Sequence, residues 1–148
     1  MASPNQFFTQ EQKDRIVSAI QEAELQTSGE IRVHIENNDG GDPWERALKL
    51  FHKLGMTQTE ERNGILFYLA IQDKHFTIMA DEGIHAKVPD NFWENIKAEM
   101  EGKFRDGAFT EGLCDGIIQA GKSLKQFFPH DGENDQNELP DDISFKDE

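Results

Sequence analysis

Three short polar stretches carry most of the side chains that could perform chemistry. They are Thr27-Ser28-Gly29-Glu30, Glu60-Glu61-Arg62-Asn63-Gly64 and Asp81-Glu82-Gly83. Together they hold five carboxylates, one arginine and several loop carbonyls. Hard divalent cations such as Ca²⁺ and Mg²⁺ prefer oxygen ligands of these kinds. The stretches therefore indicate a divalent-cation site or, as the structural alternative, a mixed charge cluster at the edge of a sheet.

A second acidic set consists of Glu36, Asp39, Asp42 and Asp73, and structural roles explain it better. Asp42 precedes a proline, which is the pattern of a helix N-cap. Asp39 stands before two glycines and Asp73 lies between two predicted strands, so both are typical turn residues. We therefore favour the first set as the metal site.

Other patterns exclude several common sites. Residues 131–136 resemble the start of a calcium loop but lack the required glycine and a following helix, which excludes an EF-hand. The sequence contains neither a P-loop nor a GxSxG motif. The five histidines are scattered and are expected mostly at the surface. Cys114 stands beside apolar residues in a predicted helix, which favours a small buried residue over a reactive thiol.

Three predicted strands must position the polar stretches. Residues 30–36 alternate between apolar and polar side chains, which is typical of a strand with one buried face. Residues 65–71 form the longest apolar run and predict a central strand covered on both faces. Residues 75–80 return after the short polar turn at 72–74, so we expect a hairpin.

Four helices are predicted around these strands. They begin at the Thr9 capping box, at Asp42-Pro43, at Pro89-Asp90 and after Gly107, and the last ends at Pro129. The order α-β-α-β-β-α-α makes the first two strands parallel and the third antiparallel, with the apolar strand in the middle. We therefore predict the α/β class: a three-layer α/β/α sandwich with a small mixed sheet. This topology brings the three polar stretches together at one edge.

Length and charge bound the organisation of the chain. Its 148 residues predict one α/β domain over residues 1–129 and an acidic, largely disordered tail over 130–148. The net charge is −14, and the twenty residues from Pro129 onward, with eight carboxylates and one lysine, carry half of it.

Charge and hydropathy also restrict location and partners. Nucleic acids and anionic membrane surfaces require a basic footprint that this acidic chain lacks. No apolar run is long enough for a signal peptide or a membrane-spanning helix. We expect a cytoplasmic monomer with no membrane insertion and no nucleic-acid partner; another protein of unknown identity is an open alternative.

The ordered polar motifs also match a known family. They are Thr27-Ser28-Gly29-Glu30-Ile31-Arg32-Val33, Arg62-Asn63-Gly64-Ile65-Leu66, Asp81-Glu82-Gly83-Ile84, and Phe104-Arg105-Asp106-Gly107-Ala108-Phe109 with Gly112-Leu113. In order and spacing they resemble the TPM-domain family over about residues 8 to 129. The resemblance implies the sandwich fold derived above. It also implies divalent-cation binding in some members, acid phosphatase activity in a plant relative and receptor modulation in an animal relative.

The resemblance carries over to individual positions of this chain. The matching residues are Ser28, Glu30, Arg62, Asn63, Asp81 and Gly83. Our first hypothesis is a Ca²⁺ or Mg²⁺ site formed by Asp81 with Glu30 and Glu82, where Arg62 orients a carboxylate or binds an anion. The alternatives are a non-catalytic interaction or assembly module, and a weak metal-assisted acid phosphatase at the same place.

Overall fold

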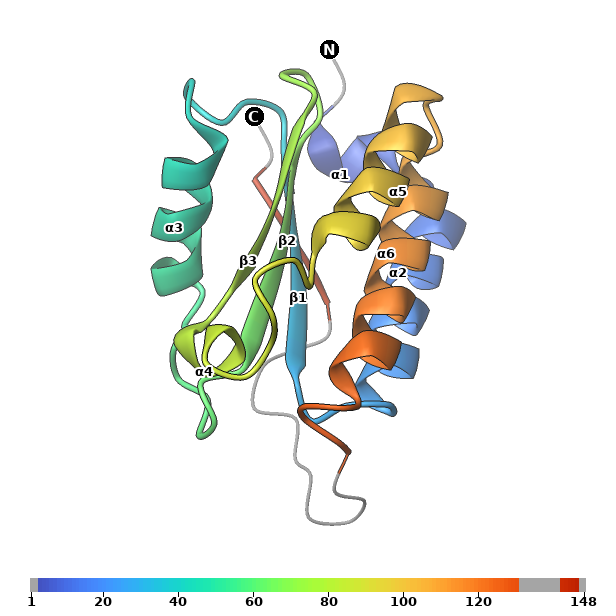
Figure 1. The fold of residues 1–148 in the computed structure, drawn as a ribbon. Helices are drawn as coiled ribbons and strands as arrows, with labels where there is room; N and C mark the ends of the chain where they lie inside the picture. Colours follow the sequence, from blue (N-terminus) through green and yellow to red (C-terminus); the bar gives the residue numbers. More distant parts are fainter. Residues whose placement is uncertain (1–2, 131–141, 147–148) are drawn as a thin grey trace.

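A computed structural model describes residues 3–130 and 142–146 (Figure 1). In chain order its elements are α1 (Pro4–Phe7), α2 (Gln10–Glu24), β1 (Glu30–Glu36), α3 (Pro43–Lys53), β2 (Gly64–Ala70), β3 (His75–Ala80), α4 (Glu82–His85), α5 (Glu94–Arg105), α6 (Phe109–Leu124) and β4 (Ile143–Phe145). The predicted capping box is present, since Thr9 Oγ1 accepts from Gln12 N at 3.1 Å.

The strands form one mixed sheet with the order β3-β2-β1-β4. β1 runs parallel to β2 from the pair Glu30–Gly64 to the pair Glu36–Ala70. β2 runs antiparallel to β3 and pairs Ile65 with Ala80. These pairings confirm the predicted strand directions, and β2, which is buried along its whole length, lies inside the sheet.

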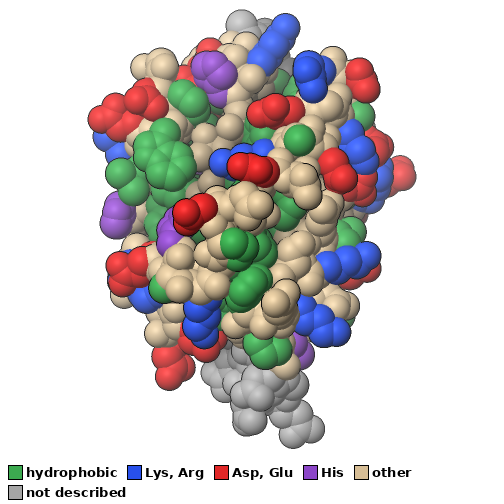
Figure 2. Space-filling view, viewed as in Figure 1, with side chains coloured by type: hydrophobic (Ala, Val, Ile, Leu, Met, Phe, Trp, Pro, Cys, Tyr) green, Lys and Arg blue, Asp and Glu red, His purple; other side chains and the backbone are tan. Residues whose placement is uncertain are grey.

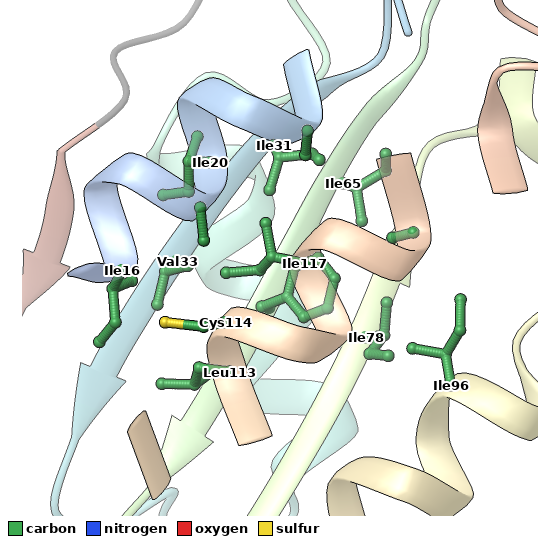
Figure 3. Close-up of a cluster of buried hydrophobic side chains, with 14 of the residues drawn as sticks. Ile16, Ile20, Ile31, Val33, Ile65, Ile78, Ile96, Leu113, Cys114 and Ile117 are labelled. Carbon is green, nitrogen blue, oxygen red and sulfur yellow. The ribbon is translucent and has the colours of Figure 1, made fainter. Parts of the chain in front are cut away.

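One face of the sheet packs against α2 and α6. The side chains Ile31 and Val33 of β1 and Ile65 of β2 point to this face and meet Ile20 of α2 and Ile117 of α6 (Figure 3). Close contact between the two helices is possible because residue 121 is a glycine: a Cβ there would lie 2.7 Å from Cα of Ala23. α5 packs beside α6, and its Ile96 and Met100 belong to the same core (Figure 1).

The opposite face packs against α3. Leu50 and Phe51 of α3 contact Leu66 and Tyr68 of β2 and Met79 of β3 in a second, smaller core. The sheet therefore lies between two helical layers (Figure 1), as predicted. α3 covers mainly β2 and β3, so the polar side chains of β1 on this face take part in a hydrogen-bond network instead of an apolar core.

Several local features differ from the sequence predictions. The third long helix begins at Glu94 and not at Pro89-Asp90, because Phe92 turns out of the helix and packs edge-on against Phe127, with ring centroids 5.8 Å apart. Trp44, in the first turn of α3, is 53% exposed although it is a large apolar residue.

The C-terminal stretch also differs from its prediction. Residues 143–145 form β4, parallel to β1, in a region for which we expected no regular structure. The alternating Ile143 and Phe145 pack against the large core, and their pairing covers the edge of β1. The remainder of the predicted disorder, at 131–141 and 147–148, lies outside the described residues. In the part that is described, every helix falls short of the length and apolarity that crossing a membrane requires.

Candidate functional site

Polar residues gather at both ends of the sheet. We call Ser28, Glu61, Arg62, Asn63, Asp81 and Glu82 the amino-end cluster, because they lie where β1 and β2 begin. We call Asp39, Asp73 and His75 the carboxyl-end cluster, because they lie just beyond the ends of β1 and β2 and at the start of β3.

Arg62 holds the amino-end cluster together. Its Nε and Nη2 donate to Oδ2 and Oδ1 of Asp81 at 2.7 and 2.9 Å, and its Nη1 donates to Glu82 Oε1 at 3.1 Å. Asp81 is 5% exposed, and its Oδ1 also accepts from the backbone N–H of Glu82 at the start of α4. The hydrogen bonds that Arg62 donates to Asp81 raise the pKa of Arg62 further. Both oxygens of Asp81 are thus already engaged by donors.

The remaining residues of this end are also mutually bonded. Asn63 Nδ2 donates to the carbonyl of Ser28 and to Glu61 Oε2, both at 3.2 Å, and Ser28 Oγ donates to Glu61 at 3.1 Å. Gly83 packs so closely that a Cβ would lie 2.1 Å from the carbonyl oxygen of Glu61. Only glycine fits there, which explains this residue type without a ligand.

The structure therefore brings the three predicted stretches together as a hydrogen-bonded cluster in which Arg62 pairs with Asp81 and Glu82. Glu30 is buried at the first position of β1, and its backbone N–H donates to the Asn63 carbonyl. A cation bound by Asp81, Glu82 and Glu30 would have to displace the Arg62 guanidinium. Cation binding at this end stays a prediction.

Backbone hydrogen bonds assemble the carboxyl-end cluster from two loops. The N–H of Ile71 donates to the Glu36 carbonyl at 2.9 Å, and those of Gln72 and Asp73 donate to the Asn37 carbonyl at 2.9 and 3.3 Å. The turn between β2 and β3 is thereby fixed to the loop after β1. This contact follows from the parallel pairing of β1 and β2, which end side by side.

Within that frame, three ligand-type side chains converge. Asp39 Oδ2 lies 2.5 Å from His75 Nδ1, and Asp73 Oδ2 accepts from the Asp39 N–H at 2.8 Å. The Asp39 side chain is fully buried, whereas that of His75 is 47% exposed. The hydrogen bond from the Asp39 backbone lowers the pKa of Asp73, and so does the bond from Asn38. The cluster is therefore a buried carboxylate with a more accessible carboxylate and imidazole beside it.

This arrangement suits a metal ion. One oxygen from each of Asp39 and Asp73 and one ring nitrogen of His75 all lie within 4.8 Å of one another, and no other group of three such residues occurs within 3–130 and 142–146. Carboxylates and imidazole are common ligands of divalent cations.

A buried network lies directly below the cluster. Glu36, at the end of β1, is 1% exposed. It accepts from Nε and Nη2 of Arg46, both at 2.8 Å, and from the Tyr68 hydroxyl. Its Oε1 lies 3.0 Å from His34 Nε2, and His34 Nδ1 lies 2.9 Å from Ser144 Oγ of β4. Because a carboxylate only accepts, Nε2 carries the His34 proton.

The network fixes the charge states of its members. Burial by itself would raise the pKa of Glu36, but the hydrogen bonds from Arg46, His34 and Tyr68 outweigh it and hold that pKa far below the usual range. Burial, followed by the bond to Glu36, raises the pKa of Tyr68 well above that of a free phenol. A rigid, ionised carboxylate thus anchors the loop that carries Asp39.

The sequence predictions gave this end structural roles, and these are confirmed in part. Asp42 caps α3, since its side chain accepts from the Glu45 N–H, and Asp39 Oδ1 accepts from the Gly41 N–H in a turn. His75 lies at the surface, as expected of most of the histidines, but its contact with Asp39 was missed. The available signal was its position at the start of the returning strand, opposite the end of β2, whose turn is bonded to the loop after β1.

Comparisons with known proteins agree with this architecture. The TPM domain family model matches residues 2–123. The solution structure of the BA42 protein from Bizionia argentinensis is 44% identical, with a TM-score of 0.89 over 95% of this chain and 96% of that one.

More distant structures share the fold alone. The N-terminal domain of a P. gingivalis protein is 21% identical, with a TM-score of 0.68 over 83% of this chain and 80% of that one. The N-terminal domain of the cg2496 protein from Corynebacterium glutamicum is 13% identical, with a TM-score of 0.61 over 84% and 76%. No curated protein matches the chain.

Proposed function

The chain belongs to the TPM domain family, and we propose that it is a divalent-cation-binding protein whose site is the carboxyl-end cluster. The convergence of Asp39, Asp73 and His75 within 4.8 Å carries this proposal. The three side chains come from a loop and a turn that backbone hydrogen bonds join, so little ordering is required when an ion binds.

The pairing of individual carboxylates favours this end over the other. Arg62 neutralises Asp81 at the amino end and occupies both of its oxygens. At the carboxyl end, the described structure gives Asp39 no cationic partner other than the titratable His75, and Asp73 accepts from the Asn38 side chain and the Asp39 N–H. Two carboxylates without a permanent countercharge attract a cation more strongly than a carboxylate already paired with arginine.

Ca²⁺ and Mg²⁺ remain our proposed ions. Two carboxylates supply part of an oxygen shell, and backbone carbonyls or water complete it, as is usual for both ions. The imidazole of His75 adds a nitrogen ligand, which Mn²⁺ and Zn²⁺ accept more readily. Comparing the four ions therefore tests whether His75 ligates the ion or only orients Asp39.

Isothermal titration calorimetry of the full chain with each chloride salt tests the proposal. We expect Asp73→Asn to weaken binding of the preferred ion by about tenfold or more, because it removes a charged ligand while its amide still hydrogen-bonds. Asp90→Asn is the matched control, since Asp90 is exposed in the turn before α5.

Asp81→Asn decides between the two ends of the sheet. If Asp81→Asn abolishes binding and Asp73→Asn does not, the site lies at the amino end and the proposal is wrong. If no ion produces heat on titration and the spectra of the protein do not change, the hypothesis of cation binding is refuted. An interaction module is then the better hypothesis.

A further inference from the structure

A cavity of about 680 Å³ lies beside the carboxyl-end cluster and shares only His75 with it. It is bounded by the start of β3, by the turn between α5 and α6, and by Pro43 at the beginning of α3. β3 is an outer strand of the sheet. Figure 2 shows that the surface between α3 and α5 carries hydrophobic side chains among charged ones. The volume falls in the range of small-molecule sites, roughly 300–1,000 Å³.

Aromatic rings form the inner wall of this cavity. Phe104 of α5 meets Phe76 of β3 edge-on, with centroids 5.1 Å apart, and stacks on Phe109 of α6 at 5.6 Å. All three lining phenylalanines are only partly buried. Such a wall offers both faces and edges of rings, which favours a flat aromatic ligand over an aliphatic one.

Two cations stand at the same cavity. Lys74 and Arg105 line it and are exposed, and neither forms an ion pair or a side-chain hydrogen bond with any described residue. The chain has 29 acidic and only 15 basic residues, so a lining with two basic residues and one acidic residue reverses the overall balance. Glu101 is the one carboxylate in the lining.

The backbone of Lys74 adds a second observation. Its φ is +58°, in the left-handed region that glycine adopts without steric cost. A lysine in that conformation projects from the turn between β2 and β3 at the edge of the cavity.

We propose that this cavity binds an aromatic anion. The ring lies among Phe76, Phe104 and Phe109, and the acidic group, a carboxylate or a phosphate, is held by Lys74 and Arg105. Charge-assisted hydrogen bonds from two cations supply the specificity for an anion, and the phenylalanines supply contact area. This binding does not require the metal ion, although His75 lines the cavity and belongs to the carboxyl-end cluster.

The test is an amide chemical-shift titration of the full chain in EDTA. The probes are 1-naphthoate, 1-naphthyl phosphate and the neutral 1-naphthalenemethanol, which share one ring system. We expect both anions to shift residues 74–76 and 104–109 and to bind about tenfold more tightly than the alcohol. The relative affinity of the two anions shows which acidic group the cavity prefers.

Charge variants complete the experiment. Lys74→Gln and Arg105→Gln should each weaken naphthoate binding severalfold, whereas Lys97→Gln, an exposed position of α5 outside the cavity, should leave it unchanged. Lys74→Gly also removes the charge, and glycine adopts the left-handed backbone conformation of this position without strain. Weaker binding by this variant therefore cannot be attributed to a folding defect. The proposal is overturned if millimolar probe shifts neither segment, if the alcohol binds as tightly as the anions, or if both glutamine variants bind normally. The titration in EDTA contains no free metal ion. A negative result for the aromatic anion therefore does not bear on the proposed cation site.

Discussion

Glu36→Gln should expose how strongly the buried network supports the carboxyl-end cluster. Glutamine has nearly the shape of glutamate but no charge, so it leaves the guanidinium of Arg46 without its countercharge. Removing one partner of a buried pair typically costs about 3–5 kcal/mol. Arg46 is 23% exposed and can regain some hydration, and glutamine keeps an acceptor. We therefore expect a loss of about 2–3 kcal/mol at neutral pH.

The stability difference between the parent protein and Glu36→Gln should depend on pH. The folded pKa of Glu36 lies far below its ordinary value. Its ionisation therefore stabilises the fold above about pH 4.5 and loses this effect as the pH falls. Below that pH the parent protein should lose about 1.4 kcal/mol per pH unit on account of Glu36 alone. The stability difference between parent and variant should consequently shrink toward low pH.

Urea denaturation at several pH values measures this difference. Glu22→Gln, at an exposed position of α2, is the control and should follow the parent at every pH. A Glu36→Gln protein as stable as the parent at neutral pH would refute the reasoning. So would a deficit that stays constant between neutral and acidic pH, because it would show that Glu36 does not titrate abnormally.

Further predictions concern the tyrosine, two glycines and the metal. Tyr68 is the one tyrosine of the chain, so tyrosinate absorbance should show no ionisation of the folded protein near pH 10 but ordinary ionisation in urea. Its raised pKa means that its stabilising effect is lost as the pH rises above about 10. Gly83→Ala should destabilise by about 1–3 kcal/mol in urea melts, because its Cβ would overlap the Glu61 carbonyl. Gly102→Ala is its matched control: no atom lies within 4 Å of the new Cβ inside α5, so it should gain up to about 1 kcal/mol. The preferred cation at a hundred times its Kd should stabilise the fold by about 2.7 kcal/mol, seen as a rise in Tm that EDTA reverses.

Periodicity and handedness made the sheet predictable. The alternation in residues 30–36 and the apolar run at 65–71 gave the two strands, and the right-handed crossover gave their parallel pairing. The same logic placed Arg62 beside Asp81, which are bonded in the structure. The strand pairing and the proximity of Arg62 and Asp81 both follow from the directions of the strands, which can be predicted from the order of elements in the sequence.

Features set by distant contacts were less accessible. The pattern of residues 143–145 is too short to stand out in an acidic segment, and β4 forms only because the edge of β1 is available to it. Most of the histidines were expected at the surface, yet His34 is only 3% exposed. Its burial is possible because Glu36 and Ser144 satisfy both of its ring nitrogens. His75 and Asp39 are hydrogen-bonded although they lie 36 positions apart in the sequence.

Paramagnetic broadening by Mn²⁺ tests the central claim most directly. The two ends of the sheet are about 20 Å apart, since seven-residue β2 rises roughly 3.3 Å per residue. An ion at the carboxyl-end cluster should selectively broaden the amide signals of residues 38–41 and 72–76. Ca²⁺ or Mg²⁺ should compete with Mn²⁺ and restore those signals. Selective broadening of residues 28–30, 61–64 and 81–83 would instead place the ion at the amino-end cluster and contradict the proposed site.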